Sequence, residues 1–333
     1  MKRKNRVGVV LTGVVILGAL VATALTVRAY QQPLGEALQA SAPTATGLVD
    51  TQSLPQAAPT LEQPLVCGEA AAWNILVLGS DAADLRGERG SDLTRILRVD
   101  IPNRKVIVFA FPRTLWVDTA GLGLTNPTVD ASQLGTVFYE ARSRSTVTSM
   151  KDALVAGTNT TALMLSKNFS VYTDHYLTVD LSQIPAMVDT VGGIPINIPQ
   201  ETTDPFIGIV IPAGQQTLNG AQFVAYARAI PDSDFGRIQR NNLLLVALRA
   251  KLLEPSVWGN IPQLYTQFKD TIATDLSPEQ INHLSCLLKE VPADGIVQDQ
   301  VRQEWTNPGP QPGSLLWDKI SVLNRLKELS LVQ

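Results

Sequence analysis

The chain has 333 residues, of which 45% are hydrophobic and 17% are charged, and its formal net charge is −3. This composition is typical of a globular protein with one large domain or two smaller ones. The slightly acidic balance argues against nucleic-acid binding, because a phosphate backbone requires a basic surface. We therefore expect no nucleic-acid partner.

A long apolar run lies near the N-terminus. Residues Val7 to Val27 contain no charged side chain, and as a helix they would extend about 32 Å, enough to cross a hydrocarbon core of roughly 30 Å. Basic residues precede the run and only Arg28 closely follows it, which places the start of the chain in the cytoplasm and the remainder outside. Ala22–Ala24 resembles a signal-peptidase site, so a cleaved signal peptide is the alternative. We predict a single-pass anchor in the cell membrane over residues 7–27, with an extracytoplasmic domain.

Residues 29–66 are rich in Pro, Gln, Ala, Ser and Thr and show no apolar period, which is typical of a linker. The predicted organisation has four parts: a cytoplasmic tip and anchor over 1–28, an extracellular linker over 29–66, a main domain over 67–295, and a C-terminal extension over 296–333 that ends in a packed helix.

The chain contains two cysteines, Cys67 and Cys286. An even number of cysteines in an exported chain permits one disulfide, and two buried free thiols are the alternative. A disulfide that closes so long a loop would stabilise the fold by on the order of 4–5 kcal/mol.

Polar residues lie beside the ends of the predicted strands. The apolar run Asn74–Asp81 ends in Gly-Ser-Asp and predicts a buried strand that leads into a loop. Two further strands are expected over 96–99 and 105–111, and the second ends at Pro112-Arg113. Asp81 and Arg113 thus follow strands and Asp92 precedes one, which is typical of ligand sites in α/β sheets.

The later elements alternate between helices and strands. Ser277 and Gln280 form a capping box at the start of the helix that carries Cys286. The expected elements, in order, are helices over 133–142 and 147–156, a strand over 174–181, a helix closed by Gly192-Gly193, a strand over 194–199, a Pro/Gly-rich excursion over 203–219, a short helix that carries Tyr226 and Arg228, a helix from Phe235 to near Pro255, a helix from Pro278, and a final helix over 315–329.

The stretch from Tyr226 to Asn241 concentrates charge. Its charged residues are Arg228, Asp232, Asp234, Arg237 and Arg240. The helix pattern places Arg237 and Arg240 on one face in its first turns, beside free N–H groups and the positive dipole end. Guanidinium groups in that position suit a phosphate. The alternative is a solvated helix start with Asp234 as the N-cap.

The candidate residues fit phosphoryl chemistry. Magnesium is typically held by one or two carboxylates together with phosphate oxygens and water, and Asp81 and Asp92 would supply the carboxylates. Phosphoryl transfer also requires cations aimed at the phosphate oxygens, as Arg113 and the arginines above would be. The sequence contains no G-x-S-x-G elbow, H-E-x-x-H motif or Walker loop that would indicate another mechanism.

Over roughly residues 73–255 the chain resembles the LytR–CpsA–Psr family of cell-wall glycopolymer transferases. The motifs that carry the resemblance are NILVLGSD, Ser91-Asp92, Phe111-Pro112-Arg113, DHYLTVDL, DTVGGIPINIP, and LNGAQFVAYAR followed by DFGRIQR. The resemblance implies a three-layer α/β/α sandwich around a central mixed sheet, with a tunnel for a polyprenyl chain. It implies magnesium-assisted transfer of a glycopolymer from a polyprenyl pyrophosphate carrier to a sugar hydroxyl of a peptidoglycan acceptor.

The resemblance also implies roles for single residues. Asp81 and Asp92 would bind magnesium or act as the base, and Arg113 would complete the catalytic set. The residues implied for pyrophosphate binding are Arg89, Arg113, Arg228, Arg237 and Arg240.

Several motif positions depart from the family pattern. They are Gly90 in place of Arg, Thr114 in place of Asp, Gln133-Leu134-Gly135 in place of Lys-Leu-Asn, Phe138 in place of Tyr, Ile230 in place of Arg, and Asn241 in place of Gln. Arg95 or Arg98 could replace the missing charge, but strand alternation does not decide which of them faces the site. These changes leave a second function open, that of a weakened relative that binds polyprenyl phosphates or glycans without transferring them.

Overall fold

The computed structural model describes residues 29–38, 66–68, 72–80, 90–124, 130–144, 149–204, 207–229, 233–258 and 272–332. The anchor predicted over residues 7–27 and most of the predicted linker lie outside these ranges. None of the helices within them is both long and apolar enough to cross a membrane.

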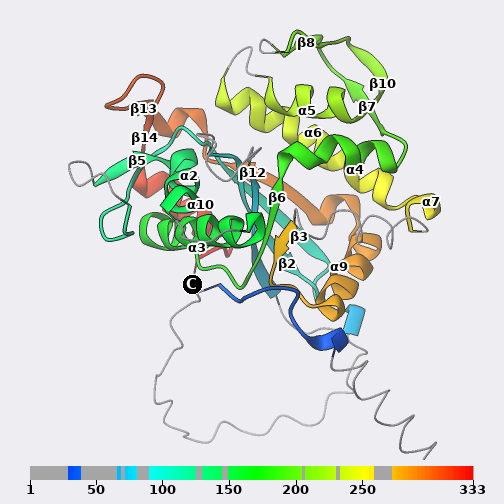
Figure 1. The fold of residues 1–333 in the computed structure, drawn as a ribbon, viewed down its shortest axis with the longest axis horizontal. Coiled ribbons are helices and arrows are strands. Elements are labelled where there is room, and N and C mark those ends of the chain that lie inside the picture. Colours follow the sequence, from blue (N-terminus) through cyan, green and yellow to red (C-terminus); the bar gives the residue numbers. More distant parts are fainter. Residues whose placement is uncertain are drawn as a thin grey trace, which may run out of the picture.

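A six-stranded mixed sheet forms the centre of the molecule, in the order β11-β6-β1-β2-β3-β12 (Figure 1). Its strands are β1 (Ala72–Ser80), β2 (Ser91–Asp100), β3 (Lys105–Phe111), β6 (His175–Asp180), β11 (Ile272–Thr274) and β12 (Ile296–Gln300). β1 is antiparallel to β2 and parallel to β6, and β3 is antiparallel to β2 and parallel to β12. The predicted α/β fold with a central mixed sheet is therefore confirmed.

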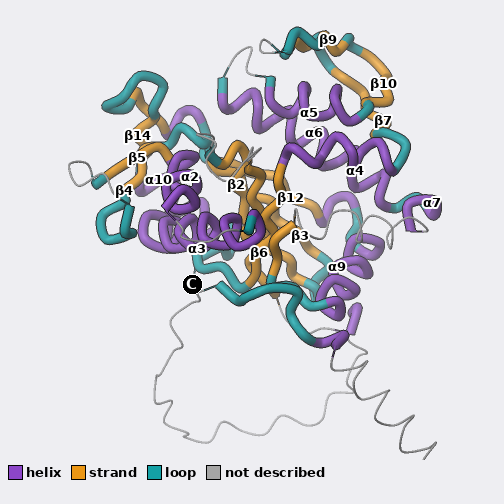
Figure 2. Tube along the Cα trace, viewed as in Figure 1, coloured by secondary structure: helices purple, strands orange, loops and turns teal. Residues whose placement is uncertain are grey.

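Helices cover both faces of this sheet (Figure 2). On one face, α2 (Leu134–Arg144), α3 (Met150–Phe169) and α10 (Lys319–Glu328) pack on strand residues such as Leu76 and Ile96. On the other face, α9 (Pro278–Glu290) buries Leu287 against Trp73, Ile75 and Val99. Strand residues alternate between these two cores, as the pleat of a strand requires.

A second group of elements has its own hydrophobic core beside the central sheet. It consists of α4 (Ile184–Thr190), β7 (Ile194–Ile198), β8 (Thr202–Thr203), β9 (Val210–Ile211), β10 (Gly214–Leu218), α5 (Gly220–Arg228) and α6 (Asp234–Leu252). The Pro/Gly-rich excursion forms the β8–β9 pair and the strand β10, which pairs with β7. Asn219 and Gln222 form a capping box that starts α5.

The remaining elements are short. They are η1 (Val66–Gly68), β4 (Trp116–Asp118), β5 (Ala131–Gln133), η2 (Leu181–Gln183), α7 (Pro255–Trp258), η3 (Ala293–Gly295), η4 (Gln303–Trp305), β13 (Thr306–Pro308) and β14 (Leu315–Trp317). The final helix begins at Lys319 rather than Leu315, because residues 315–317 pair with β13 as a strand.

The C-terminal residues belong to the same folded unit as the main domain. β12 pairs in parallel with β3, from Ile296 opposite Val106 to Gln300 opposite Ala110. α10 adds Val322 to the core beneath the central sheet. The boundary expected between residues 295 and 296 therefore falls immediately before a strand of the central sheet, and the final helix packs on the domain as predicted.

Part of the predicted linker also packs on the domain. We call residues Leu34–Leu38 the strap. The backbone N–H of Leu34 donates to the carbonyl of Leu276 at 3.2 Å, and the hydroxyl of Tyr176 donates to the carbonyl of Glu36 at 3.1 Å. Leu38 is only 4% exposed and belongs to the main hydrophobic core. The strap is thus an ordered edge of the domain rather than linker.

Cys67 and Cys286 form a disulfide across a sequence separation of 219 residues. The bond ties η1, just before the first strand of the central sheet, to the middle of α9. It therefore fixes α9 to the residues that lead into that sheet.

Candidate phosphate-binding site and adjoining cavity

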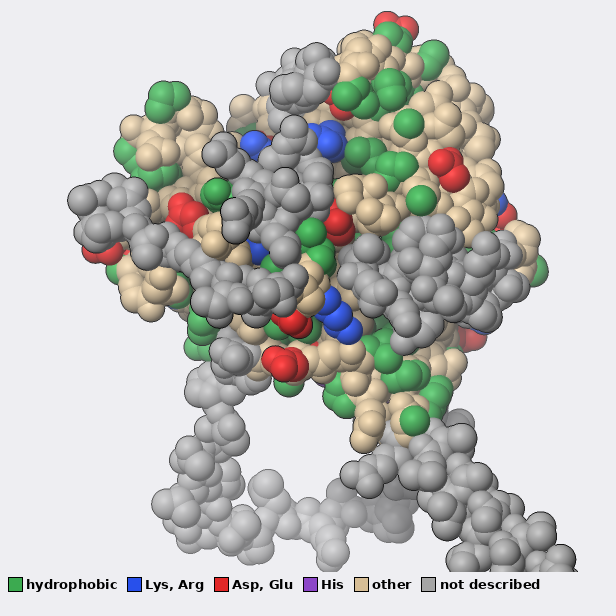
Figure 3. Space-filling model, viewed as in Figure 1, with side chains coloured by type: hydrophobic (Ala, Val, Ile, Leu, Met, Phe, Trp, Pro, Cys, Tyr) green, Lys and Arg blue, Asp and Glu red, His purple; other side chains and the backbone are tan. Residues whose placement is uncertain are grey.

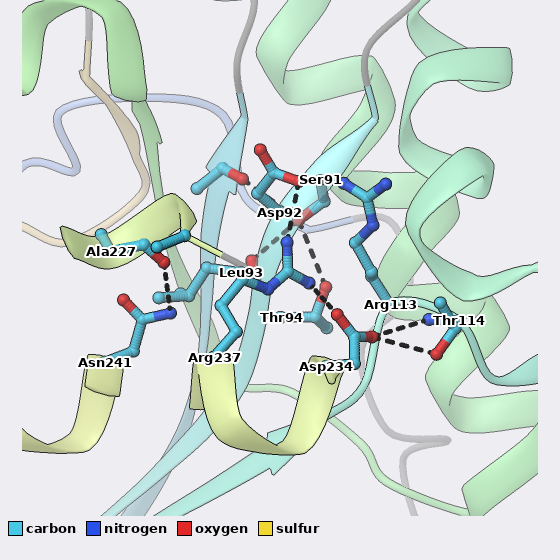
Figure 4. Close-up of polar contacts among 12 residues, drawn as sticks. Ser91, Asp92, Leu93, Thr94, Arg113, Thr114, Ala227, Asp234, Arg237 and Asn241 are labelled. Atoms are coloured by element: carbon cyan, nitrogen blue, oxygen red, sulfur yellow. Dashed lines mark hydrogen bonds and ion pairs between the residues drawn. The ribbon is translucent and has the colours of Figure 1, made fainter. Parts of the chain in front are cut away.

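Charged side chains of both signs lie in the middle of one face of the molecule, between the α5–α6 region and the α2–α3 region (Figure 3). Asp92, the second residue of β2, lies at the centre of a group of charged side chains (Figure 4). Its Oδ1 accepts hydrogen bonds from Nη1 of Arg113 and, at 3.2 Å, from Nη1 of Arg237. The structure thus brings together three predicted site residues from β2, the end of β3 and α6.

The three side chains differ in exposure. Arg237 is 3% exposed and Asp92 is 15% exposed, whereas Arg113 is 42% exposed. A buried arginine that points at a carboxylate is held in a fixed position, while the more exposed one can reach a ligand from the open side. The solvated helix start considered from the sequence does not describe Arg237.

Asp234 does not cap α6, which excludes that part of the alternative considered from the sequence. Ser233 is the N-cap, because it has the extended backbone that the position requires, and its Oγ accepts from the N–H of Gly236 at 3.2 Å. Oδ1 of Asp234 instead accepts from Nη2 of Arg237 at 2.5 Å. Its Oδ2 accepts from the N–H of Thr114 at 3.2 Å and from the hydroxyl of Thr114 at 3.0 Å. Asp234 therefore joins α6 to the turn after β3 and holds one side of the Arg237 guanidinium.

Arg240 and Arg228 lie where α5 meets α6. Arg240 is 9% exposed, and its Nη2 donates to the carbonyl of Ala229 just after α5. Burial raises the pKa of the nearby Tyr226, and the positive charge of Arg240 partly opposes that shift. Arg228 is the last residue of α5 and is half-buried. Arg240 thus connects the two helices, and its predicted role toward pyrophosphate stays a prediction.

Asp81 and Arg89 lie outside the described residues, so their predicted roles also stay predictions. Within the described ranges, no group of three or more His, Cys, Asp or Glu side chains could hold a metal ion. Magnesium needs only one or two protein carboxylates when phosphate oxygens complete its coordination. Asp92 is the predicted magnesium ligand that the structure describes. Its Oδ1 faces the arginines, and its Oδ2 accepts no hydrogen bond from the described residues.

Two of the replaced motif positions, Gly90 and Gly135, touch each other. A Cβ on Gly90 would lie 1.9 Å from the carbonyl oxygen of Gly135, and a Cβ on Gly135 would lie 2.9 Å from Cβ of Arg113. The N–H of Gly135 also donates to the carbonyl of Arg113 at 2.8 Å. Neither position admits a side chain unless the backbone moves. The start of α2 therefore packs directly on β2 and on the turn that carries Arg113.

The structure decides between Arg95 and Arg98. Arg95 is 2% exposed beneath α6, and its Nη1 and Nη2 donate to Oδ1 of Asn242 at 2.6 Å and to the carbonyl of Ile238 at 3.4 Å. Arg98 lies on the opposite face of β2, where its Nη1 donates to Oδ1 of Asn74 at 3.2 Å. Burial lowers the pKa of Arg95 to about 10, so the side chain stays charged at neutral pH.

A cavity of about 900 Å³ lies between the central sheet, α6 and α9. Its wall is mainly apolar and extends from Leu97 on β2 to the strap residue Leu34. Gln298 lines the cavity and donates from Nε2 to the carbonyl of Asn242 at 3.2 Å. The cavity does not include the Asp92 group but begins farther along the same strand and the same helix. Its volume and mainly apolar lining suit an apolar ligand.

The sequence profile of the LytR_cpsA_psr family matches residues 47–321. The chain is 24% identical over 207 residues to regulatory protein MsrR from Staphylococcus aureus, and the match covers 61% of this chain and 56% of MsrR. It is 23% identical over 219 residues to the polyisoprenyl-teichoic acid–peptidoglycan teichoic acid transferase TagU from Enterococcus faecalis, and the match covers 64% of each protein. The chain therefore spans less than two thirds of the length of these curated relatives.

The fold also matches solved structures. The crystal structure of Bacillus subtilis TagV superimposes with a TM-score of 0.62 at 20% identity, over 80% of this chain and 99% of TagV. The structure of TagT bound to LIIa-WTA gives a TM-score of 0.59 at 17% identity, over 78% of this chain and 89% of TagT. These similarities concern the fold. Because the family profile covers most of the chain, this protein belongs to the LytR–CpsA–Psr family.

Proposed function

We propose that this protein is a phosphotransferase that moves a glycopolymer from a polyprenyl pyrophosphate carrier to a sugar hydroxyl of peptidoglycan. The observation that carries the proposal is the position of Arg113 and Arg237, which converge on Asp92 next to the apolar cavity. A polyprenyl pyrophosphate has an anionic head and a long apolar chain. Arginine forks suit the head, and an apolar cavity suits the chain.

The distance along the secondary structure agrees with such a ligand. From Arg237 to the first cavity residue of α6, Leu245, the helix rises by about 12 Å. From Asp92 to Leu97, β2 advances by about 17 Å. A single ligand could therefore place its phosphates beside the arginines and its first isoprene units in the cavity.

The names of the relatives support the same reaction class. TagU of Enterococcus faecalis and TagV of Bacillus subtilis are named as transferases of teichoic acid from a polyisoprenyl carrier to peptidoglycan. The predicted anchor over residues 7–27 would keep this protein at the outer face of the membrane, where such a carrier and peptidoglycan meet.

In the proposed reaction, the oxygen of a sugar hydroxyl on peptidoglycan attacks the phosphorus that bears the glycopolymer. A new phosphorus–oxygen bond forms, the bond from this phosphorus to the bridging oxygen breaks, and polyprenyl monophosphate leaves. The hydroxyl proton passes to a carboxylate, for which Asp81 and Asp92 are the candidates. Arg113 and Arg237 would stabilise charge on the phosphate oxygens. Magnesium held by these two carboxylates would supply further neutralisation of that charge.

A second function, lipid or glycan binding without transfer, is favoured by one observation. Gly90 and Gly135 are packed against each other where the resemblance implies Arg and Asn, so two polar side chains of the family pattern cannot be present here. The same assay distinguishes the two functions. A binding protein would retain the lipid pyrophosphate after chelation of magnesium and would release no product.

The test is a transfer assay with the full-length protein in detergent, a polyprenyl-pyrophosphate-linked glycan, peptidoglycan and magnesium. We expect release of polyprenyl monophosphate, and a loss of about a hundredfold in Arg113→Met, since one cation that faces the phosphate is removed. Arg302→Met is the matched control, because Arg302 is 44% exposed and lies elsewhere on the surface. If the wild type released no polyprenyl monophosphate, or if Arg113→Met matched it, the proposed reaction would be refuted.

A further inference from the structure

Arg95 is a buried cation that the fold alone does not explain. Its side chain is 2% exposed, and within the described part of the chain it meets an amide oxygen and a backbone carbonyl but no carboxylate. Burying a charged group without an opposite charge is costly, so such groups are found where a charge has a use. Burial lowers the pKa of Arg95 to about 10, which still leaves the guanidinium charged at neutral pH.

Arg95 lies between the two parts of the proposed substrate site, the arginine cluster around Asp92 and the apolar cavity. On β2 it comes three residues after Asp92 and two before Leu97, the first residue of that strand that lines the cavity. On α6 it contacts Ile238 and Asn242, which follow Arg237 and precede the cavity residues. Arg95 therefore lies between the arginine cluster and the apolar wall along both elements.

Two hydrogen bonds through Asn242 connect Arg95 to a residue of the cavity wall. Asn242 accepts from Arg95 through its side chain, and its carbonyl accepts from Gln298, which lines the cavity. Of these three residues Gln298 lines the cavity, and Arg95 and Asn242 lie behind its wall on the side of the Asp92 group. An apolar chain that fills the cavity would bring its attached phosphate to this side.

We propose that Arg95 binds the phosphate that is linked directly to the lipid chain. This assignment rests on the proposed function, because it requires a lipid phosphate as the ligand. The guanidinium has five N–H donors, and the two contacts above engage only part of them. Arg113 and Arg237 would then hold the outer phosphate, which carries the glycopolymer. The resemblance implies a cationic side chain at position 90, but the backbone there packs on Gly135 and leaves no room for one. Arg95 would supply the positive charge instead.

The experiment measures binding of three probes to the full-length protein in lipid nanodiscs: farnesol, farnesyl monophosphate and farnesyl pyrophosphate. In Arg95→Met we expect a loss of affinity of about tenfold or more for the monophosphate, because a charge-assisted contact is removed. The loss for the pyrophosphate should be smaller, since its outer phosphate keeps Arg113 and Arg237. Farnesol should bind as it does to the wild type, and Arg95→Lys should recover part of the lost affinity.

Arg98→Met is the matched control, because Arg98 lies on the same strand but faces the opposite side. It should bind all three probes like the wild type. Wild-type affinity of Arg95→Met for both phosphates would overturn the assignment, and so would a parallel loss of farnesol binding, since Arg95 would then only support the cavity wall. If the wild type bound farnesol but neither phosphate, the proposed function itself would fail, and with it this assignment.

Discussion

Asp234→Asn tests whether the start of α6 depends on a single carboxylate. One oxygen of Asp234 accepts from Arg237 and the other accepts twice from Thr114, and the side chain is 8% exposed. Asparagine has one oxygen and one NH₂ group, so in either orientation an NH₂ faces a donor. The substitution also removes the negative charge opposite Arg237, which is 3% exposed. Removing one partner of a buried ion pair typically costs 3–5 kcal/mol, and since asparagine keeps either the Arg237 contact or the two Thr114 contacts, we expect a loss of about 3 kcal/mol.

The measurement is equilibrium unfolding of the full-length protein in guanidinium chloride, followed by tryptophan fluorescence. Asp318→Asn is the matched control, because Asp318 caps α10 at the surface and asparagine is an equally good N-cap. It should leave the unfolding midpoint unchanged. Asp234→Asn should also weaken binding of inorganic pyrophosphate, since Arg237 loses the contact that orients it. A loss of stability below about 1 kcal/mol for Asp234→Asn would refute the reasoning, because it would be no larger than the average effect of a single substitution.

Three further predictions concern the scaffold. Reduction of the Cys67–Cys286 bond should lower the free energy of unfolding by about 5 kcal/mol, because the bond closes a loop of 219 residues. The double variant Cys67→Ser/Cys286→Ser has no such bond, so reductant should not change its stability. A change in that variant would contradict the explanation. Gly157→Ala should destabilise by about 1–3 kcal/mol in the same unfolding assay, because the new Cβ would lie 2.7 Å from the buried ring of Phe138, and wild-type stability would show that the ring can move. Burial raises the pKa of the Tyr176 hydroxyl, so its stabilising contribution is complete below the ordinary tyrosine pKa of about 10 and is lost as the pH rises from there toward the raised value. Unfolding at pH 8 and pH 10.5 should therefore show a smaller alkaline loss in Tyr176→Phe than in the wild type, and equal losses would contradict this.

Much of the central sheet could be predicted from the sequence because its main strands are apolar runs bounded by turns. β1, β2, β3 and β6 all fall within or overlap the expected strands. β12 was missed, because its residues, Ile-Val-Gln-Asp-Gln, are all half-buried and show no alternation of apolar and polar side chains. Its pairing with β3 joins residues that are 190 positions apart in the sequence, which no local pattern reveals.

The length of α3 was also underestimated. The sequence pattern supported a helix only over 147–156, whereas α3 extends to Phe169. The part beyond the expected end at residue 156 begins with Gly157 and contains Thr158, Thr160 and Thr161, residue types with low helix propensity. Thr158 compensates through buried hydrogen bonds of its hydroxyl to the carbonyl of Leu154 and to Thr178 on β6. Tertiary contacts therefore stabilise this part of α3, where the local helix propensity is low.

The sequence predicted three residues that meet at the candidate site, but not the contacts that hold them in place. Asp92, Arg113 and Arg237 come together as expected from strand ends and a helix start. The role of Asp234 could not be predicted, because its partner Thr114 lies 120 residues away. The sequence also could not predict that Arg95, rather than Arg98, lies on the face of β2 covered by α6, because this depends on where α6 packs on the sheet.

The strap and the C-terminal helix have a consequence for where this fold begins and ends. The strap and all but the first turn of α10 lie outside the family match over residues 47–321, yet Leu38 and Leu326 enter the same hydrophobic core. Gly35 passes so close to the edge strand β11 that a Cβ there would lie 2.5 Å from the carbonyl oxygen of Thr274. A fragment cut at the family limits would lose both ends and expose their apolar contacts to water. Because Leu38 and Leu331 belong to one core, that core cannot close until the chain has been synthesised through about residue 331.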